Sequence, residues 1–383
     1  MPASFGVFPL SGSGRAGWTR RLKEGFRLLS AWQHLSRIAR ASRSIPTTDL
    51  YFANACRDWL KPAVRSGAGE LRRHREPLIR RIGANSFLAG DQAVVCRRDA
   101  SGVVDAILSD PALQLTYVID DDLDAAHDDE SLPADYRSRL ARLREGQYRA
   151  LVERAQTIVV PTDHLAAKFA ATHDVRQLGP VWAGPLADDS HFDRLARGKA
   201  FQIAYLGSVT HGADRAFVIK VLEAVLAARP DAAVTMIARG KLGCSLDGHP
   251  RLRLRRPLPW ALHRARHARL RFHLALYPML DTPFNRGRSI NKVIEHAVLG
   301  AVGLYSADWV FADRIRDGET GFLAPNEESA WVAAILSAMD DPAGLRAMQA
   351  KARAAAQVLN DPTPQRLFWG ERLGLEGWRR FEA

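Results

Sequence analysis

The chain has 383 residues, of which 47% are hydrophobic and 25% charged, and a formal net charge of +12. This length suits two domains of about 100–200 residues each, and the composition is typical of a soluble globular protein. The sequence has no apolar run near the roughly 18 residues of a membrane span, no signal peptide, and three cysteines too scattered for a zinc knuckle or a disulfide framework, so we expect a cytoplasmic protein.

Positive charge is bunched in two segments. Residues 15–43 contain eight arginines and lysines but one glutamate, interleaved with Trp18, Phe26 and other apolar residues. Such a basic amphipathic helix either packs on the sheet of its domain or lies on an anionic membrane surface. Residues 251–271 contain eight arginines and no acid. The net charge indicates an anionic partner, which could be nucleic acid, acidic lipid or a phosphorylated substrate.

A glycine-rich loop opens the chain. Gly12, Gly14 and Gly17 have the G-x-G-x-x-G spacing after a predicted strand at residues 4–10 and before the basic helix, which is the dinucleotide-binding fingerprint. NAD binding would need an acid roughly 20 residues further on, and none lies between Arg27 and Thr48. We therefore interpret the glycines as a loop whose backbone approaches a ligand closely, with NAD binding kept as an alternative.

The rest of the first half alternates apolar strand patterns with helix patterns, which is typical of a parallel sheet. The predicted strands cover residues 50–54, 92–96, 115–119 and 157–160, and the predicted helices 102–108, 135–155 and 164–171. Asp120, Asp121 and Asp122 directly follow the strand at 115–119. Their mutual repulsion should raise at least one pKa and suit proton handling, or else they cap the next turn.

The pattern then begins again, which predicts a second sheet of the same kind facing a cleft. A polar segment at residues 186–198 separates the halves; strands at 201–206 and 234–238 flank a loop at 207–214 and a helix at 215–228. The final segment, 364–381, follows a proline-rich break.

Residues 283–300 join a basic loop to a helix that should begin just beyond the end of a buried strand at 272–278. Open α/β sheets bind ligands at that place. The helix buries one apolar stripe, and its other face carries Ser289, Lys292 and Glu295. A hydroxyl, a lysine and Arg288 at a helix start predict a phosphate site, although any surface helix has a solvated polar face.

This region resembles the C-terminal domain of the GT-B glycosyltransferases, especially the family 4 (group 1) type. The residues that carry the resemblance are Phe284, Asn285, Arg286, Ser289, Lys292, Glu295, Gly300 and Ser306, followed by Asp317, Gly318, Thr320 and Gly321. It implies an α/β fold of two Rossmann-like domains with parallel sheets facing a central cleft. Residues 1–186 would form the acceptor domain, residues 199–360 the nucleotide-sugar donor domain, and residues 361–383 a helix packing back on the first domain.

The resemblance also implies a site. Catalytic roles fall on Asp120, Asp121, Asp122 and His211; donor binding falls on Gly207, Ser208, Asp214, Arg288, Ser289, Lys292, Glu295, Gly318, Thr320 and Gly321; the glycines at 12, 14 and 17 form the acceptor-side loop. No metal or other cofactor is expected, because GT-B enzymes need none. The alternative is a GT-A enzyme, in which the aspartate triplet would hold a divalent ion.

The implied reaction transfers a sugar from a nucleotide-sugar donor with retention of configuration. The basic segments suggest a glycan or lipid-linked acceptor in cell-envelope polysaccharide or glycolipid synthesis, at the inner face of the cytoplasmic membrane. The family has an earlier glutamate at the position of Gly287, so an inactive scaffold is one alternative. The family's arginine-lysine pair after the first strand of the second domain is also missing, and Arg215 or Lys220 would supply that charge. A nucleic-acid-binding protein is another, but it would not need Glu295, and no nucleic acid is expected.

Overall fold

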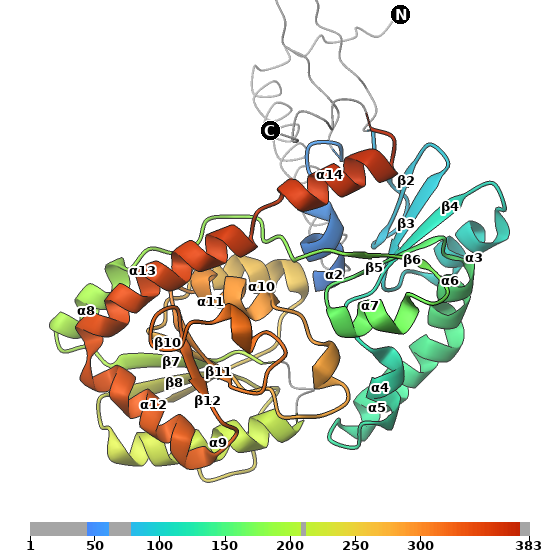
Figure 1. The fold of residues 1–383 in the computed structure, drawn as a ribbon. Coiled ribbons are helices and arrows are strands. Elements are labelled where there is room, and N and C mark those ends of the chain that lie inside the picture. Colours follow the sequence, from blue (N-terminus) through green and yellow to red (C-terminus); the bar gives the residue numbers. More distant parts are fainter. Residues whose placement is uncertain (1–43, 61–77, 208–211, 376–383) are drawn as a thin grey trace, which may run out of the picture.

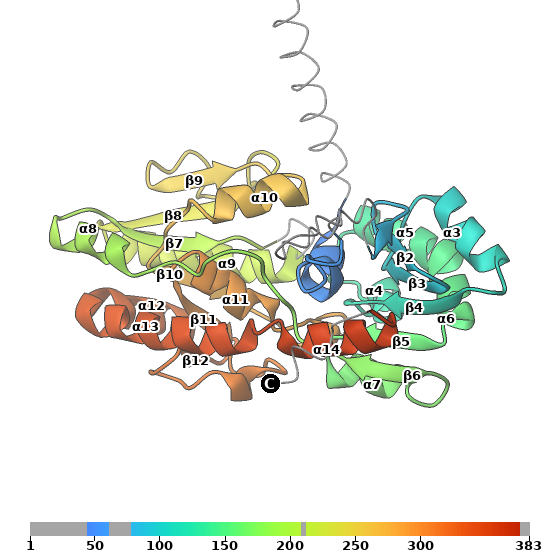
Figure 2. The ribbon, with the colours of Figure 1, turned by 90° about the horizontal axis from the view of Figure 1, so that it is seen from above.

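The computed structural model describes residues 44–60, 78–207 and 212–375, which form two α/β domains next to each other (Figures 1 and 2). The first domain has a six-stranded sheet whose strands follow one another in sequence order. Its strands β1, β2 and β3 pair antiparallel, whereas β3 to β6 are parallel. The strands are β1 (Arg80–Arg81), β2 (Ser86–Ala89), β3 (Gln92–Cys96), β4 (Gln114–Val118), β5 (Thr157–Val160) and β6 (Asp174–Gln177).

Both faces of the first sheet are buried, as expected for short runs of Val, Ile and Leu. One face packs on the helices that cross between its parallel strands, and the other on residues 50–59 and the C-terminal helix. The helical elements are α2 (Pro46–Thr48), α3 (Ser101–Ser109), α4 (Leu123–Asp128), α5 (Ala134–Leu143), the π-turn η2 (Arg144–Tyr148), α6 (Arg149–Arg154) and α7 (Asp163–Phe169).

The second domain has an all-parallel sheet with the order β12-β11-β10-β7-β8-β9. Numbered within the domain and read from β9, this is 3-2-1-4-5-6, the doubly wound order. The order in which the strands are added therefore reverses between β7 and β10, although all strands stay parallel. The strands are β7 (Phe201–Tyr205), β8 (Ala232–Ile237), β9 (Leu252–Arg255), β10 (Leu274–Tyr277), β11 (Val302–Ser306) and β12 (Phe322–Ala324).

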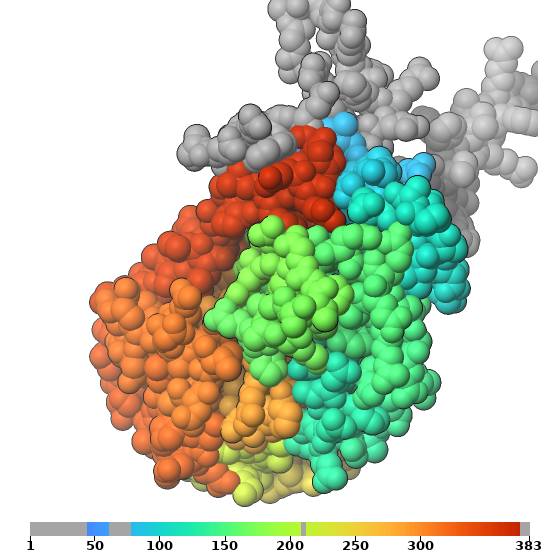
Figure 3. All heavy atoms as spheres, turned by 45° about the vertical axis from the view of Figure 1, so that its right-hand side comes forward, coloured from blue at the N-terminus to red at the C-terminus, as the bar shows by residue number. Residues whose placement is uncertain are grey.

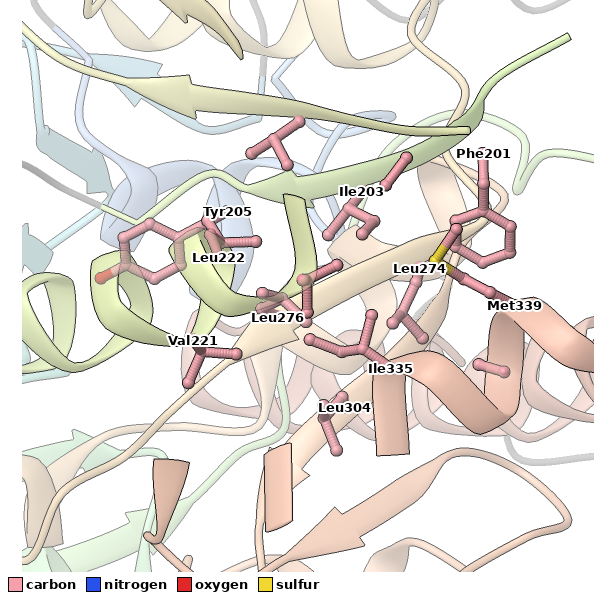
Figure 4. Close-up of a cluster of buried hydrophobic side chains, with 14 of the residues drawn as sticks. Phe201, Ile203, Tyr205, Val221, Leu222, Leu274, Leu276, Leu304, Ile335 and Met339 are labelled. Atoms are coloured by element: carbon pink, nitrogen blue, oxygen red, sulfur yellow. The ribbon is translucent and has the colours of Figure 1, made fainter. Parts of the chain in front are cut away.

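Helices cover both faces of the second sheet. On one face, Leu222 of α9 and Ile335 of α12 meet Leu274 and Leu304 of the central strands (Figure 4). On the other face, Leu299, directly after α11, packs with Ala204 and Ala275 of the central strands. The helices are α8 (Asp193–Ala196), α9 (Gly212–Ala228), α10 (Trp260–His267), α11 (Asn291–Val298), α12 (Glu328–Asp340), α13 (Pro342–Leu359) and α14 (Thr363–Arg372).

The C-terminal helix α14 leaves the second domain and lies on the first (Figures 1 and 3). Trp369 is fully buried there, and its Nε1 donates to the Tyr51 carbonyl at 3.0 Å. The two crossings between the domains are tied together at Asn360. Its Oδ1 accepts from the Trp182 backbone N at 2.6 Å, and its Nδ2 donates to the Trp182 carbonyl at 3.1 Å. The exact domain boundaries stay a prediction.

The strand predicted at residues 50–54 is wrong, because this segment is helical. Pro46 stands in the first turn of α2, which continues into the π-turn η1 (Asp49–Ala53). The apolar run that suggested a strand is buried on the sheet instead, with the Phe52 ring 4.5 Å from Phe87 and 4.8 Å from Trp369. The β2–β3 hairpin was missed, although the Gly90–Asp91 turn signals it. The strand at 4–10, the glycine loop and the basic helix lie outside the described residues.

Candidate functional site

A cavity of about 1910 Å³ lies between the domains. The carboxyl ends of β3 and β4 supply its first wall, and those of β7, β8 and β10 its second. The second wall includes the reversal between β7 and β10, which is where doubly wound sheets bind ligands. Gly207 lies there, separated from the end of β7 by Leu206, and a Cβ on it would be 2.7 Å from the Tyr205 ring.

Three of the predicted donor residues come together at the start of α11. Ser289, Lys292 and Glu295 all line the cavity. Lys292 Nζ is 2.5 Å from Glu295 Oε2, and Glu295 Oε1 is 2.9 Å from Nε2 of His267 and 3.4 Å from Nε2 of His263. Burial alone would raise the pKa of Glu295, but the lysine and the imidazoles outweigh it and hold this pKa well below its usual range. The glutamate is therefore ionised at neutral pH.

Arg288 connects the two domains. Its Nη1 is 2.6 Å from Asp121 Oδ1, and Nη1 of Arg97 is 2.5 Å from Asp121 Oδ2. One carboxylate of the first domain thus lies between two guanidinium groups, one from each domain. The loop before Arg288 also enters the first domain, because the buried side chain of Phe284 belongs to its core.

The aspartate triplet is divided by the structure. Asp120 and Asp121 line the cavity. Asp120 Oδ1 accepts from Thr47 Oγ1 at 2.8 Å, and burial, with repulsion from Asp121 second, raises the pKa of Asp120. Repulsion between the aspartates, the cause that the sequence predicts, therefore raises this pKa less than burial does.

Asp122 does not belong to the cavity lining outlined by the described residues, and its catalytic role stays a prediction. Its Oδ1 caps α4 by accepting from the backbone N of Asp124 and Ala125 at 3.2 and 3.0 Å. Lys168 Nζ lies 2.5 Å from the same oxygen, and His164 Nε2 is 3.1 Å from Oδ2. The side chain is occupied in holding α4 against α7.

The loop with Gly318, Thr320 and Gly321 also lies outside the cavity lining as the described residues outline it, so its donor-binding role stays a prediction. They directly precede β12, which runs parallel to β11, so they lie at the amino end of the sheet while the cavity lies at the carboxyl end. Thr320 Oγ1 accepts from the Arg316 backbone N at 2.9 Å, and Gly318 has a φ of 71°. The loop is a tight turn that directly precedes β12.

Asp214 lines the cavity but is used in packing. Its Oδ1 accepts from the Leu280 backbone N at 3.2 Å and Asn285 Nδ2 at 3.4 Å, which ties α9 to the loop after β10. The predicted residues Ser208 and His211, and the glycines at 12, 14 and 17, lie outside the described residues. Of the proposed substitutes, Arg215 lines the cavity, whereas Lys220 pairs with Glu328 at 2.8 Å.

Several functional candidates were missed from the sequence. Arg98, Arg239 and Lys241 line the cavity, and the structure shows no ion pair between them and a carboxylate of the described chain. Arg239 and Lys241 follow the end of β8, a position that strand prediction could have indicated. His263 and His267 are four residues apart on α10, a spacing that places them on one helix face.

No model of a known protein family matches the chain, and no curated protein matches its sequence. HepE from Anabaena with UDP and glucose is similar in fold, with a TM-score of 0.51 at 14% identity over 74% of this chain and 77% of that chain. HepE with UDP-glucose gives 0.50 at 15% identity over 74% and 78%. TarM gives 0.50 at 11% identity, covering 72% of this chain and 53% of that chain.

Identities this low show the fold. Within the described part of the chain, no helix is both long and apolar enough to cross a bilayer. The predicted fold class is confirmed: the chain, with two α/β domains and a doubly wound second sheet, has the GT-B fold.

Proposed function

We propose that this protein transfers a sugar from a nucleoside-diphosphate sugar to an acceptor bound in the cavity. The observation that carries the proposal is the position of Lys292. This residue lies in the first turn of α11 and lines the cavity, at the carboxyl ends of β7 and β10, where the strand order reverses. Backbone N–H groups at the start of this helix and the ammonium would both face a diphosphate.

Each group has a role in this reaction. The leaving group is a nucleoside diphosphate, so charge on it must be stabilised as the glycosidic bond breaks. Lys292 and Arg288 supply positive charge, and Ser289 a hydroxyl donor. Glu295, ionised and held by Lys292, still has lone pairs free to accept from ribose hydroxyls. Asp120, whose pKa is raised, lies on the opposite wall and would handle the acceptor proton.

The finer assignments belong to the same proposal. We assign the chain to the family 4 type, with a retaining reaction in which the departing diphosphate helps to deprotonate the acceptor. UDP is the first donor nucleotide to test, because HepE, which is similar in fold, has been solved in complex with UDP-glucose. We also propose that the protein acts in cell-envelope polysaccharide or glycolipid synthesis and attaches to an anionic membrane. The transfer would need no metal on the diphosphate.

A donor assay tests the main proposal. Hydrolysis of UDP- or GDP-sugars without acceptor or added Mg²⁺ should fall about 10²–10³-fold in Lys292→Met. Lys351→Met is the matched control, because Lys351 is half exposed and pairs with Glu319 at 3.4 Å. Activity of Lys292→Met equal to that of the control would refute the site.

The inactive-scaffold alternative rests on Gly287, where the family has a glutamate. A Cβ at Gly287 would be 3.3 Å from the Asp122 Cβ, so this position is closed against the first domain. A nucleotide that raises the melting temperature of the protein without any donor turnover would favour the scaffold. Turnover that depends on Lys292 would exclude it.

A further inference from the structure

His263, His267 and Glu295 form a compact cluster between α10 and α11. One ligand atom from each residue lies within 4.8 Å of the other two. Glu295 Oε1 is 2.9 Å from His267 Nε2 and 3.4 Å from His263 Nε2, and His267 is fully buried. Three groups that can each bind a cation therefore point at one place.

The hydrogen bond at Nδ1 of His267 fixes which ring nitrogen faces Glu295. His267 Nδ1 is 3.0 Å from the His263 carbonyl oxygen, which can only accept, so Nδ1 carries a proton. Nε2 is therefore the ring nitrogen that remains to bind a cation. It lies 2.9 Å from Glu295 Oε1 but makes no aligned hydrogen bond with the described residues. A cation between these two atoms would be bound by both.

The donor set fits a transition-metal dication. Two imidazole nitrogens and one carboxylate oxygen, with a fourth position open, are ligands that Zn²⁺ takes at about 2.0–2.2 Å. Tetrahedral geometry at ~2.1 Å places ligand atoms roughly 3.4 Å apart. The contact of Glu295 Oε1 with His263 Nε2, at 3.4 Å, has that separation, whereas its contact with His267 Nε2, at 2.9 Å, is shorter. The three ligand atoms lie within 4.8 Å of one another, so small side-chain shifts would bring them to the metal distances.

The surroundings support the ligands, as metal sites require. The His263 carbonyl fixes the His267 ring, and Lys292 holds the other oxygen of Glu295 at 2.5 Å. His263 stacks on Trp260 with ring centroids 5.5 Å apart, and Trp260 Nε1 donates to Asp49 Oδ2 at 2.8 Å. His263 and Glu295 also line the cavity, which gives an ion a way in.

We propose that His263, His267 and Glu295 bind one divalent transition-metal ion of the Zn²⁺ class, with the fourth position toward the cavity. Bound there, the ion connects α10 to α11 and fixes the helix that carries Lys292. The inference does not depend on the proposed sugar transfer, because the ion lies on imidazoles and needs neither donor nor acceptor.

Metal binding is measured on the full chain without a histidine tag, after removal of metals with a chelator. We expect one Co²⁺ per chain and intense visible absorption from a four- or five-coordinate ion. His267→Asn keeps a donor near the His263 carbonyl but removes Nε2, and His263→Phe keeps the stack on Trp260; each should weaken Co²⁺ at least 100-fold. His127→Asn, at a half-exposed histidine outside the cluster, should bind like the parent.

A second measurement covers loss of folding in these variants. Zn²⁺ should raise the melting temperature of the parent and of His127→Asn, but not of the near-isosteric Glu295→Gln. A parent with no bound Co²⁺ and no thermal shift would mean that a second proton on His267 completes the cluster, and it would overturn the proposal. Equal Co²⁺ binding in parent and folded His267→Asn would do the same. Donor hydrolysis, assayed separately, decides the proposed function independently.

Discussion

The two walls of the cavity are built in different ways. In the second domain the sheet order itself opens a crevice between β7 and β10, and the polar groups there already contact one another through Glu295. In the first domain, as far as it is described, neighbouring strands follow one another along the chain. Its wall is defined by charges after β3 and β4, and Asp121 depends on Arg288 from the opposite wall. Sheet topology makes the wall of the second domain, whereas contact between the domains completes the wall of the first.

Removing the carboxylate shared by the two walls should have the largest effect. Asp121→Asn leaves Arg97 and Arg288 facing each other without the anion between them, and we expect a loss of about 3 kcal/mol in the free energy of unfolding. Urea denaturation measures it. Asp281→Asn removes an exposed pair with Arg286 and should cost under about 1 kcal/mol. Equal losses in the two variants would mean that the bridge between the domains contributes little.

The two arginines on Asp121 separate the walls by function. Arg288→Ala should lower kcat/KM for the donor by about 100-fold, because it removes positive charge beside the diphosphate. Arg97→Ala removes the partner on the first domain and should lower it less than about 10-fold. Both variants take one cation from the same carboxylate, so each controls for the other's effect on stability. Steady-state donor kinetics make the comparison, and a larger loss in Arg97→Ala would reverse the assignment of the walls.

Asp122 tests whether the triplet is divided as described. Burial opposes ionisation of Asp122, but Lys168, the Ala125 backbone N and His164 outweigh it and lower the pKa of this carboxyl below its ordinary value. Because the folded pKa is the lower one, the carboxylate stabilises the fold above the unfolded pKa, and this contribution is lost as pH falls through the folded pKa.

Asp122→Asn should therefore cost about 1–2 kcal/mol at pH 7, and this cost should shrink at pH values below about 4. Urea unfolding at several pH values measures it, with the exposed Asp128→Asn as the control. An Asp122→Asn variant with unchanged stability but no turnover would support the predicted catalytic role of Asp122.

The smallest effect concerns the turn before β12. Gly318→Ala should cost about 1 kcal/mol, because φ at Gly318 is 71°, and should leave the donor KM unchanged. Gly146→Ala, in η2, has open space at the added Cβ and should be neutral or slightly stabilising. A raised donor KM in Gly318→Ala would place this loop at the donor after all.

Much of the fold was predictable because apolar runs and helical periodicity both report burial. The runs at 92–96 and 157–160 match β3 and β5 to the residue, and the stripe after Ser289 identifies α11. The segment at 50–54 failed because its apolar residues are buried by a helix as well as they would be by a strand.

The site was less predictable, because strand direction and pairing across the cleft are not local. The motif at Gly318 gives no sign of which end of the sheet it occupies. Asp120 and Asp122 are alike in sequence, but one faces the cavity and the other caps α4. His267 was passed over inside a basic run, since its partner Glu295 lies on another helix.

The insertion of Phe284 into the first domain bears on how ligands reach the site. Separating the domains there would expose a large aromatic side chain, which costs about 1.5–3 kcal/mol. The hydrogen bonds of Asn360 to the Trp182 backbone also hold the two crossing segments together. We therefore expect entry at the rim where the exposed cations Arg98, Arg239 and Lys241 line the cavity. Steering of this kind predicts donor association that slows with added salt, and more weakly in Arg239→Ala. The cations at the rim would then collect the anionic donor that the deeper residues bind.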